Sequence, residues 1–265
     1  MNQHTLHRLI SINQEFYQNF GHAFAQTRRR IQPGVRWALE KWGQDGDWLD
    51  LGCGSGALAQ AWQKAGLKGS YTGVDFSLPL LAEAQNLPAA GCIETGLQIT
   101  FRQVNLAEAD WVKEFTPRSF DGIVSFAVLH HLPGAALREQ MILQAASLLK
   151  PHGLMILSVW QFQNSAKLLA RVQPWAKVGI SENEVEEGDA LLDWRYHPDQ
   201  AEQANGLRYV HLFTREELAR LRAAGGFTLL EEFESDGQGG RLGLYQVWRA
   251  GDSSGGSSEL KPDLR

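Results

Sequence analysis

The chain has 265 residues and a mass of 29.5 kDa, and 43% of its residues are apolar, which suits one α/β domain with an elaboration. Its net charge of -5 gives no overall attraction to nucleic acid, so an RNA substrate would need a local basic surface. We find no apolar run of membrane-spanning length, no signal-peptide core in the first residues, and only two cysteines, which suggest neither disulfides nor a metal cluster. We therefore expect a cytoplasmic protein that uses no membrane and no metal.

The first 46 residues predict two helices. Apolar side chains recur at helix spacing along the first of them, at Leu9, Ile12, Phe16, Phe20 and Phe24. This stripe could simply pack on the domain, or the helix could be a lid over a cofactor with Tyr17 and Arg28 turned inward. Pro33 suits the first turn of a second helix over residues 33–42. We treat residues 1–46 as an N-terminal helical lid.

A glycine-rich turn follows the first predicted strand, residues 48–51. Asp50 lies at the end of that strand, and Gly52, Gly54 and Gly56 lead into a helix. Glycines allow positive backbone φ angles and close approach of a ligand, and the helix start adds unpaired N–H groups. The lysine of a phosphate-binding loop does not follow, and Asp50 would repel phosphate. The expected ligand is a nucleoside with a positively charged or zwitterionic tail.

This acidic-x-Gly-x-Gly-x-Gly pattern resembles the first motif of the class I S-adenosylmethionine-dependent methyltransferases. The resemblance implies an α/β fold with a Rossmann-like, doubly wound, seven-stranded sheet whose last strand is antiparallel. It also implies S-adenosylmethionine as the cofactor, with S-adenosylhomocysteine as the product. Cys53, inside the turn, is expected to contact the cofactor together with Asp50 and the three glycines.

The rest of the sequence fits this plan. Strands are expected at 70–76, 98–104, 120–126 and 154–160, then an antiparallel pair at 227–233 and 242–248, with helices at 134–150 and 214–224. Asp75, at the end of the second strand, could accept hydrogen bonds from both ribose hydroxyls, or could cap the helix that starts after Ser77. Further cofactor contacts are expected from Tyr17, Phe76, Asn105, Leu106 and Phe126. Asn105 would accept a hydrogen bond from the adenine amino group through its amide oxygen.

Two segments are expected on the substrate side. His130 and His131 follow the fourth strand at its carboxyl end, where open α/β sheets bind ligands. The insert at residues 161–207 has no clear sheet pattern, holds the acidic run 181–189, and could cover the active-site edge. The methyltransferase domain would span residues 47–250, and the Gly/Ser-rich residues 251–265 would be a flexible tail.

Three further segments carry a more specific likeness: residues 17–35, SFAVLHHL at 125–132, and RYVHLF at 208–213. They resemble the eukaryotic methyltransferases that complete the wobble-uridine side chain of tRNA, including the methyltransferase domain of the AlkB-homologue tRNA hydroxylase. The resemblance implies a 5-carboxymethyl group on uridine as methyl acceptor. It also implies a small zinc-binding activator protein as a possible partner.

A carboxylate acceptor is already ionised at neutral pH, so it needs a cation to hold it rather than a general base. Arg28 and Arg208 are candidates for that carboxylate clamp, and His130 and His211 would shape the pocket. Arg28 could instead bind the carboxylate of the cofactor, and Arg208 and His211 could tie the insert to the core. The net negative charge and the acidic insert favour a second hypothesis, a methyltransferase acting on a small-molecule carboxylate, hydroxyl or amine. A third is a cofactor-binding protein without catalysis.

Overall fold

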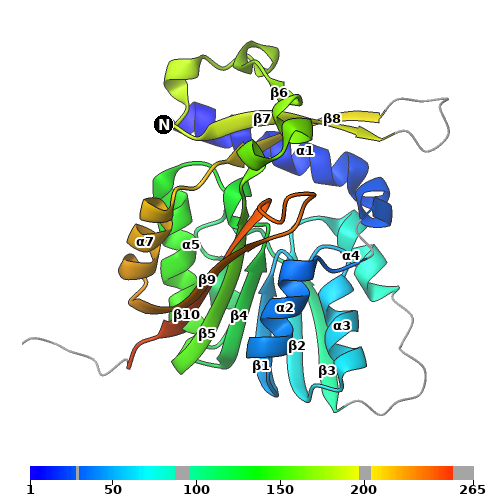
Figure 1. Cartoon of the computed structure of the whole chain (residues 1–265), viewed down its shortest axis with the longest axis vertical. Helices are drawn as coiled ribbons and strands as arrows, with labels where there is room; N and C mark the ends of the chain where they lie inside the picture. Colours follow the sequence, from blue (N-terminus) through cyan, green and yellow to red (C-terminus); the bar gives the residue numbers. More distant parts are fainter. Residues whose placement is uncertain (28–29, 87–95, 197–203, 253–265) are drawn as a thin grey trace, which may run out of the picture.

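The computed structural model describes residues 1–27, 30–86, 96–196 and 204–252, and its main body is a seven-stranded sheet (Figure 1). The strand order is β3-β2-β1-β4-β5-β10-β9. The first five of these are mutually parallel, and β10 is antiparallel to both β5 and β9. This confirms the doubly wound sheet expected from the sequence. The strands are β1 (Gly46–Leu51), β2 (Gly69–Asp75), β3 (Leu97–Gln103), β4 (Phe120–Phe126), β5 (Leu149–Trp160), β9 (Phe227–Ser235) and β10 (Gly243–Ala250).

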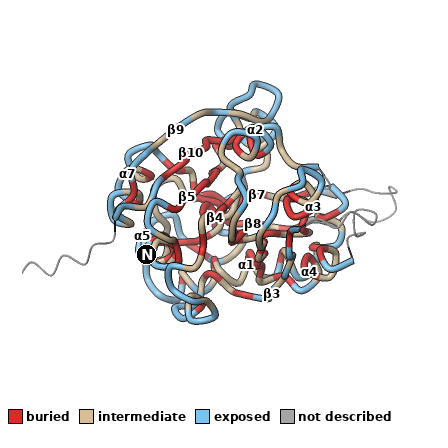
Figure 2. The backbone as a smooth tube through the Cα atoms, turned by 90° about the horizontal axis from the view of Figure 1, so that it is seen from below, coloured by how far each residue is buried: buried red, intermediate tan, exposed pale blue. Residues whose placement is uncertain are grey.

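Both faces of the sheet are buried. Successive side chains of a strand point to opposite sides, so neighbouring residues of β1 belong to different cores. Trp48 of β1 belongs to the core that includes α2 (Pro33–Trp42) and α3 (Ala57–Ala65). Leu49 and Leu51 belong to the opposite core, with α5 (Ala135–Leu148) and α7 (Arg215–Ala224). Figure 2 shows the buried residues concentrated along the central strands β4, β5 and β10. The strands that carry the active site are therefore held in a well-packed core.

The predicted N-terminal helix is α1 (Gln3–Thr27), which lies across the upper end of the main sheet (Figure 1). Leu9, Ile12 and Phe16 of its apolar stripe are buried, whereas Phe20 and Phe24 are only partly so. Farther along, the backbone carbonyl of Tyr17 accepts a hydrogen bond from the Ser77 hydroxyl, at the start of α4 (Leu78–Gln85), at 3.1 Å. The helix thus spans from the insert to the cofactor side of the sheet.

The insert differs from the expectation that it lacks a sheet. It forms a second, antiparallel sheet in the order β6-β7-β8, preceded by the short helix α6 (Ala166–Leu169). Its strands are β6 (Val172–Gln173), β7 (Asp189–Tyr196) and β8 (Ala204–His211). Leu191 packs with α1 in one cluster, and the next residue, Leu192, packs with Phe162 in another. Because both faces of β7 are buried, its sequence lacks the polar alternation that marks a strand.

Two acids of the run 181–189 bind other parts of the protein, whereas Glu182 and Glu187 are exposed. Glu184 accepts hydrogen bonds from Asn2 and Thr5 of the α1 region, at 3.2 and 3.0 Å. Glu186 forms an ion pair with Arg138 of α5 at 2.6 Å, and the Arg138 side chain is almost fully buried. These contacts fasten the insert to α1 and to α5.

Three expectations fall outside the described residues: Arg28, Cys92 and the tail beyond Asp252. Among the helices that are described, none combines the length and the apolar character that a membrane span requires.

Candidate active site

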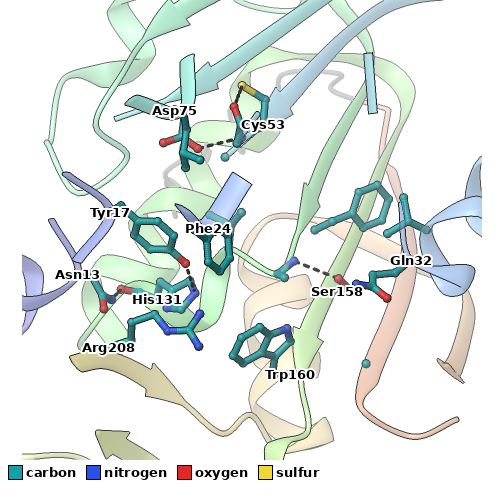
Figure 3. A pocket seen from close by; sticks show the side chains of 18 of the residues that line it. Asn13, Tyr17, Phe24, Gln32, Cys53, Asp75, His131, Ser158, Trp160 and Arg208 are labelled. Carbon is teal, nitrogen blue, oxygen red and sulfur yellow. Dashed lines mark hydrogen bonds between the residues drawn. The ribbon is translucent and has the colours of Figure 1, made fainter. Parts of the chain in front are cut away.

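A cavity of about 670 Å³ lies at the carboxyl ends of β1, β2, β4 and β5, beneath α1. Figure 3 shows Asp75 and Cys53 at one end of it, Arg208 and Trp160 at the other, and Tyr17 between them. The first end is called here the cofactor half and the second the acceptor half. The structure brings most of the predicted site residues together here: Tyr17, Asp50, Gly52, Cys53, Gly54, Asp75, Phe76, Asn105, Leu106, Phe126 and Arg208 line the cavity.

The glycine turn leaves room for a ligand at its tip. Gly54 has φ +54°, and a side chain added there would meet no atom within 4 Å, so its bare main chain faces open space. Gly52 has φ +78°, and a Cβ there would come within 2.3 Å of Val128. Gly56 is set behind the lining, where it caps the N-terminus of α3 with φ +75°. The turn therefore suits a ligand that approaches the backbone at Gly54.

Asp75 both organises the turn and faces the cavity. One carboxylate oxygen accepts a hydrogen bond from the Gly54 N–H at 3.0 Å, and the other accepts from the Ser77 N–H at 2.9 Å. Burial raises the pKa of Asp75 to about 6, against the opposing effect of these N–H donors. The cap of α4 is Ser77 rather than Asp75, and the contact of Asp75 with the ribose stays a prediction.

Asp50 is the second buried carboxylate of the cofactor half. Its Oδ2 accepts a short hydrogen bond from the hydroxyl of Tyr71. Burial raises the pKa of Asp50 to about 7, and the nearby Asp75 adds to the rise. Burial also raises the pKa of the Cys53 thiol, so this cysteine stays uncharged. Two carboxylates with raised pKa values in one half of a cavity favour a cationic ligand.

We expect cofactor affinity to depend on pH through Asp50. The ionised form rises from about a tenth of the molecules at pH 6 to about nine-tenths at pH 8, because the pKa is about 7. If Asp50 meets the ammonium of the cofactor, binding favours the ionised form, and affinity should increase about tenfold over this range. Calorimetry with S-adenosylhomocysteine at pH 6, 7 and 8 measures it. Asp50→Asn should remove most of the rise, and a flat wild-type profile would refute the assignment.

Asn105 lines the cofactor half, with its amide held by its own loop. Its oxygen accepts a hydrogen bond from the Ala107 N–H at 3.1 Å, and its nitrogen donates to Glu108 at 3.1 Å. An amide oxygen has two lone pairs, so a contact with an adenine amino group would use the second one. The loop thereby fixes which end of the amide is the acceptor.

Arg208 dominates the acceptor half. This residue of β8 is 2% exposed, and its guanidinium carbon lies 4.9 Å from the ring centre of Phe16, 5.7 Å from Phe24 and 5.2 Å from Trp160. The aromatic rings stabilise the charge by cation–π contacts and hold the planar group in place. A fixed, desolvated guanidinium is suited to binding a carboxylate with two parallel hydrogen bonds.

The two adjacent histidines have different environments. His131 lines the cavity, where its Nε2 lies 3.1 Å from the Tyr17 hydroxyl and its Nδ1 lies 2.9 Å from the backbone oxygen of Tyr209. His130, the histidine proposed from the sequence, is in the interior, stacked on Trp160 with ring centres 4.9 Å apart. The two side chains point in different directions because they occupy successive positions of a single 3₁₀ turn, Leu129–His131. Loss of solvent and the charge of Arg208 lower the pKa of His131 to about 3, so this imidazole is neutral.

His211 was expected to shape the pocket, but it lies in the interior as a tie between three elements. Its Nδ1 is 2.7 Å from Asp189 of β7, and its Nε2 is 3.1 Å from Glu217 of α7. Glu186, Asp189 and His211 could in principle ligate a metal. However, Glu186 is paired with Arg138, and His211 is held by two carboxylates. The arrangement is that of a structural network.

Sequence reasoning missed Asn13 and Trp160, which both line the cavity. Asn13 carried a usable signal, because it is a polar residue between Leu9 and Tyr17 at a spacing of four on the inner side of a helix. Trp160 carried none, since an aromatic residue at a strand end is typical of any core.

Comparison with known proteins indicates the family of the chain. Residues 23–232 match the model of a methyltransferase domain family. An Encephalitozoon cuniculi protein named as a methyltransferase is 30% identical over 218 residues, which cover 82% of this chain and 87% of that protein. The ubiquinone biosynthesis O-methyltransferase of Methylococcus capsulatus is 32% identical over 124 residues, but the match covers only 47% of either chain.

Solved structures show the same fold. A SAM-dependent methyltransferase of Methanosarcina mazei has a TM-score of 0.60 at 23% identity, covering 84% of this chain and 99% of its own. A Haloferax volcanii protein, solved in complex with the Trm112 methyltransferase activator, has a TM-score of 0.61 at 16% identity, covering 91% and 97%. The sheet topology, the acidic glycine turn and the family match agree, and the chain belongs to the methyltransferase domain family as a class I S-adenosylmethionine-dependent methyltransferase.

Proposed function

We propose that this enzyme methylates a carboxylate to its ester, and that the acceptor is the 5-carboxymethyl group of the wobble uridine in tRNA. The observation that carries the proposal is the buried guanidinium of Arg208 in the acceptor half. Arg208 belongs to the RYVHLF segment, which bears the most specific resemblance to the tRNA methyltransferases.

The neighbouring groups suit an acceptor that arrives already ionised. His131 is the imidazole of the acceptor half, and its pKa of about 3 makes it a poor general base at neutral pH. A hydroxyl acceptor would have to lose a proton beside Arg208 and this neutral ring. A carboxylate has no proton to lose and gains the attraction of the guanidinium.

The residues of the cofactor half fit S-adenosylmethionine. Asp75 would accept hydrogen bonds from the ribose hydroxyls, Asp50 would face the ammonium, and Gly54 leaves the main chain open to the methionine tail. Leu106 and Phe126 would pack against the adenosine. When bound, the cofactor supplies a methyl group on a positively charged sulfur, and its transfer to a carboxylate leaves a neutral thioether and releases no proton. The protein then has to hold the carboxylate, orient it and exclude water.

The distribution of charge supports a nucleic-acid acceptor despite the net charge of -5. Arg30, Lys167 and Arg171 line the cavity. Two acids of the insert, Glu184 and Glu186, are instead paired with groups of α1 and α5. The insert therefore adds two cationic side chains, Lys167 and Arg171, to the cavity lining, and these would attract an anionic strand.

A small-molecule acceptor is the second candidate, favoured by the partial match to ubiquinone biosynthesis O-methyltransferases. That match covers 47% of the chain, so it does not extend to the whole substrate side. A metabolite hydroxyl or amine would fit a cavity of about 670 Å³. Its methylation would have to use a base other than His131.

Labelled S-adenosylmethionine distinguishes these acceptors. One pool is tRNA carrying unesterified carboxymethyluridine, and the other is a deproteinised metabolite extract. We expect label in tRNA that is lost under mild alkali, as a methyl ester would be. Label confined to the metabolite pool would refute the tRNA proposal, and alkali-stable label in either pool would refute the carboxylate proposal.

One arm of this assay should include a small zinc-binding activator protein. The resemblance to the tRNA enzymes implies such a partner, and the Haloferax volcanii neighbour was solved with the Trm112 activator. We propose that this chain has an activator of the same kind. Equal activity with and without it would show that the chain acts alone.

A further inference from the structure

Asn13 is a buried polar residue that joins three separate segments. It belongs to α1, is 4% exposed, and lies among the buried apolar residues Leu9, Ile12 and Phe16. The amide nitrogen donates to the backbone oxygens of His131 and Tyr209 at 3.0 and 3.1 Å, and the amide oxygen accepts from the Tyr209 N–H at 2.8 Å. Both amide hydrogens and the carbonyl are thus engaged by backbone groups.

The contact at Tyr209 closes an open edge of the small sheet. β8 is the last strand in the order β6-β7-β8, so backbone groups on its outer side lack a strand partner. Asn13 supplies one donor and one acceptor to Tyr209, as a neighbouring strand would. The close packing here is also visible at Gly206 of β8, where a Cβ would come within 2.5 Å of the Phe16 ring.

The same carbonyl of Tyr209 fixes the protonation pattern of His131. A backbone oxygen can only accept, so the Nδ1 of His131 at 2.9 Å must carry the hydrogen. The imidazole is neutral, so Nε2 carries a lone pair, and the Tyr17 hydroxyl at 3.1 Å must donate to it. Since its proton is engaged by His131, the Tyr17 oxygen can meet a ligand only as an acceptor.

Tyr17 lies where the two halves of the cavity meet (Figure 3). Its ring centre is 5.8 Å from that of Phe76, which follows Asp75, and equally 5.8 Å from that of His131 in the acceptor half. A methyl group passing from cofactor to acceptor must cross this boundary. A methyl on a positively charged sulfur is electropositive and favours an oxygen acceptor.

We infer that Asn13 is a positioning residue: it holds the Tyr209 carbonyl, which fixes the Nδ1–H tautomer of His131, and His131 in turn orients the Tyr17 oxygen as an acceptor for the methyl group. Asn13 and Tyr17 are one helical turn apart, so one anchors α1 and the other acts at the cavity. The inference rests on the cofactor class and holds for any methyl acceptor.

Binding of S-adenosylmethionine and S-adenosylhomocysteine tests it without a substrate. The two ligands differ by the methyl group and the sulfur charge, so their affinity ratio reports on the Tyr17 oxygen. Tyr17→Phe and Asn13→Ala should each lower the preference for the methylated ligand about fivefold, the size of one hydrogen bond. Because both belong to one relay, the double variant should lose no more than either single one. An unchanged ratio in Tyr17→Phe, or additive losses, would overturn the inference.

Two measurements separate this role from simple stabilisation of α1. Asn2→Ala removes the hydrogen bonds of Asn2 with Glu184 and with the Thr5 N–H, both away from His131, and should leave the affinity ratio unchanged. NMR of ¹⁵N-histidine-labelled protein should show His131 as the Nδ1–H tautomer in the wild type and in Tyr17→Phe. An Nε2–H tautomer in the wild type would overturn the relay even if Asn13→Ala failed to fold.

Discussion

Replacing Arg208 by alanine is expected to lower methyl transfer by roughly a hundredfold to a thousandfold while cofactor affinity stays nearly unchanged. The guanidinium of Arg208, a residue that is 2% exposed, lies in the acceptor half, whereas Asp75 lies in the cofactor half. Its loss should therefore remove the cation that holds the acceptor. Single-turnover rates with the acceptor and calorimetry with S-adenosylhomocysteine give the two quantities.

Matched variants distinguish a role of Arg208 in holding the acceptor from a role in packing. Arg208→Met keeps much of the side-chain volume among Phe16, Phe24 and Trp160 and should be as inactive as alanine. Arg208→Lys keeps the charge but not the planar pair of donors and should be intermediate. Arg195→Ala removes an arginine of β7 that pairs with Asp193 at the surface and should behave as wild type. Equal losses of activity and cofactor affinity in Arg208→Met would show that Arg208 is structural.

Replacing Asp75 by alanine should instead weaken cofactor binding by roughly a hundredfold. Two hydrogen bonds from ribose hydroxyls to a buried carboxylate, at about 1.5 kcal/mol each, give this magnitude. Asp75 also accepts from the N–H groups of Gly54 and Ser77, so the variant could loosen the turn as well. The affinity alone does not separate these two effects.

A ligand without ribose hydroxyls separates them. The 2′,3′-dideoxy analogue of S-adenosylhomocysteine should bind the wild type roughly a hundredfold more weakly than the parent compound. Asp75→Ala should bind both ligands equally, because the partner of the hydroxyls is gone. If the variant still prefers the parent compound as strongly as the wild type, Asp75 does not contact the ribose.

The sequence predicted best those features that depend on residues adjacent in the chain. The glycine turn depends on backbone freedom at a few adjacent residues, so the amino-acid pattern alone was enough to group Asp50, Gly52 and Gly54 at one site. α7 was predicted at 214–224 and carries its own start signal, because Thr214 and Glu217 form reciprocal hydrogen bonds with each other's backbone N–H groups. The parallel strands were recognised because their apolar runs are short and end at turn residues.

The sequence predicted less well those side chains whose positions depend on contacts between distant parts of the chain. The small sheet was missed because Leu191 and Leu192 are both buried, one toward α1 and the other toward Phe162. The sequence prediction selected His130, whereas His131 lines the cavity, since adjacent residues of one 3₁₀ turn diverge only once the chain is folded. The contacts of Glu184 and Glu186 depend on α1 and α5, far away in the sequence.

The contact between α1 and β8 also bears on how the chain folds. Asn13 and Tyr209 are 196 positions apart, so at ribosomal rates the helix is made roughly ten seconds or more before the strand that covers it. During that interval the apolar face of Leu9, Ile12 and Phe16 has no β8 to pack against. Contacts of such long sequence separation form late because loop closure must come first. Because β9 and β10 also follow β8 in the chain, neither the helical cover of the active site nor the complete main sheet can form until the C-terminal part of the chain has been made.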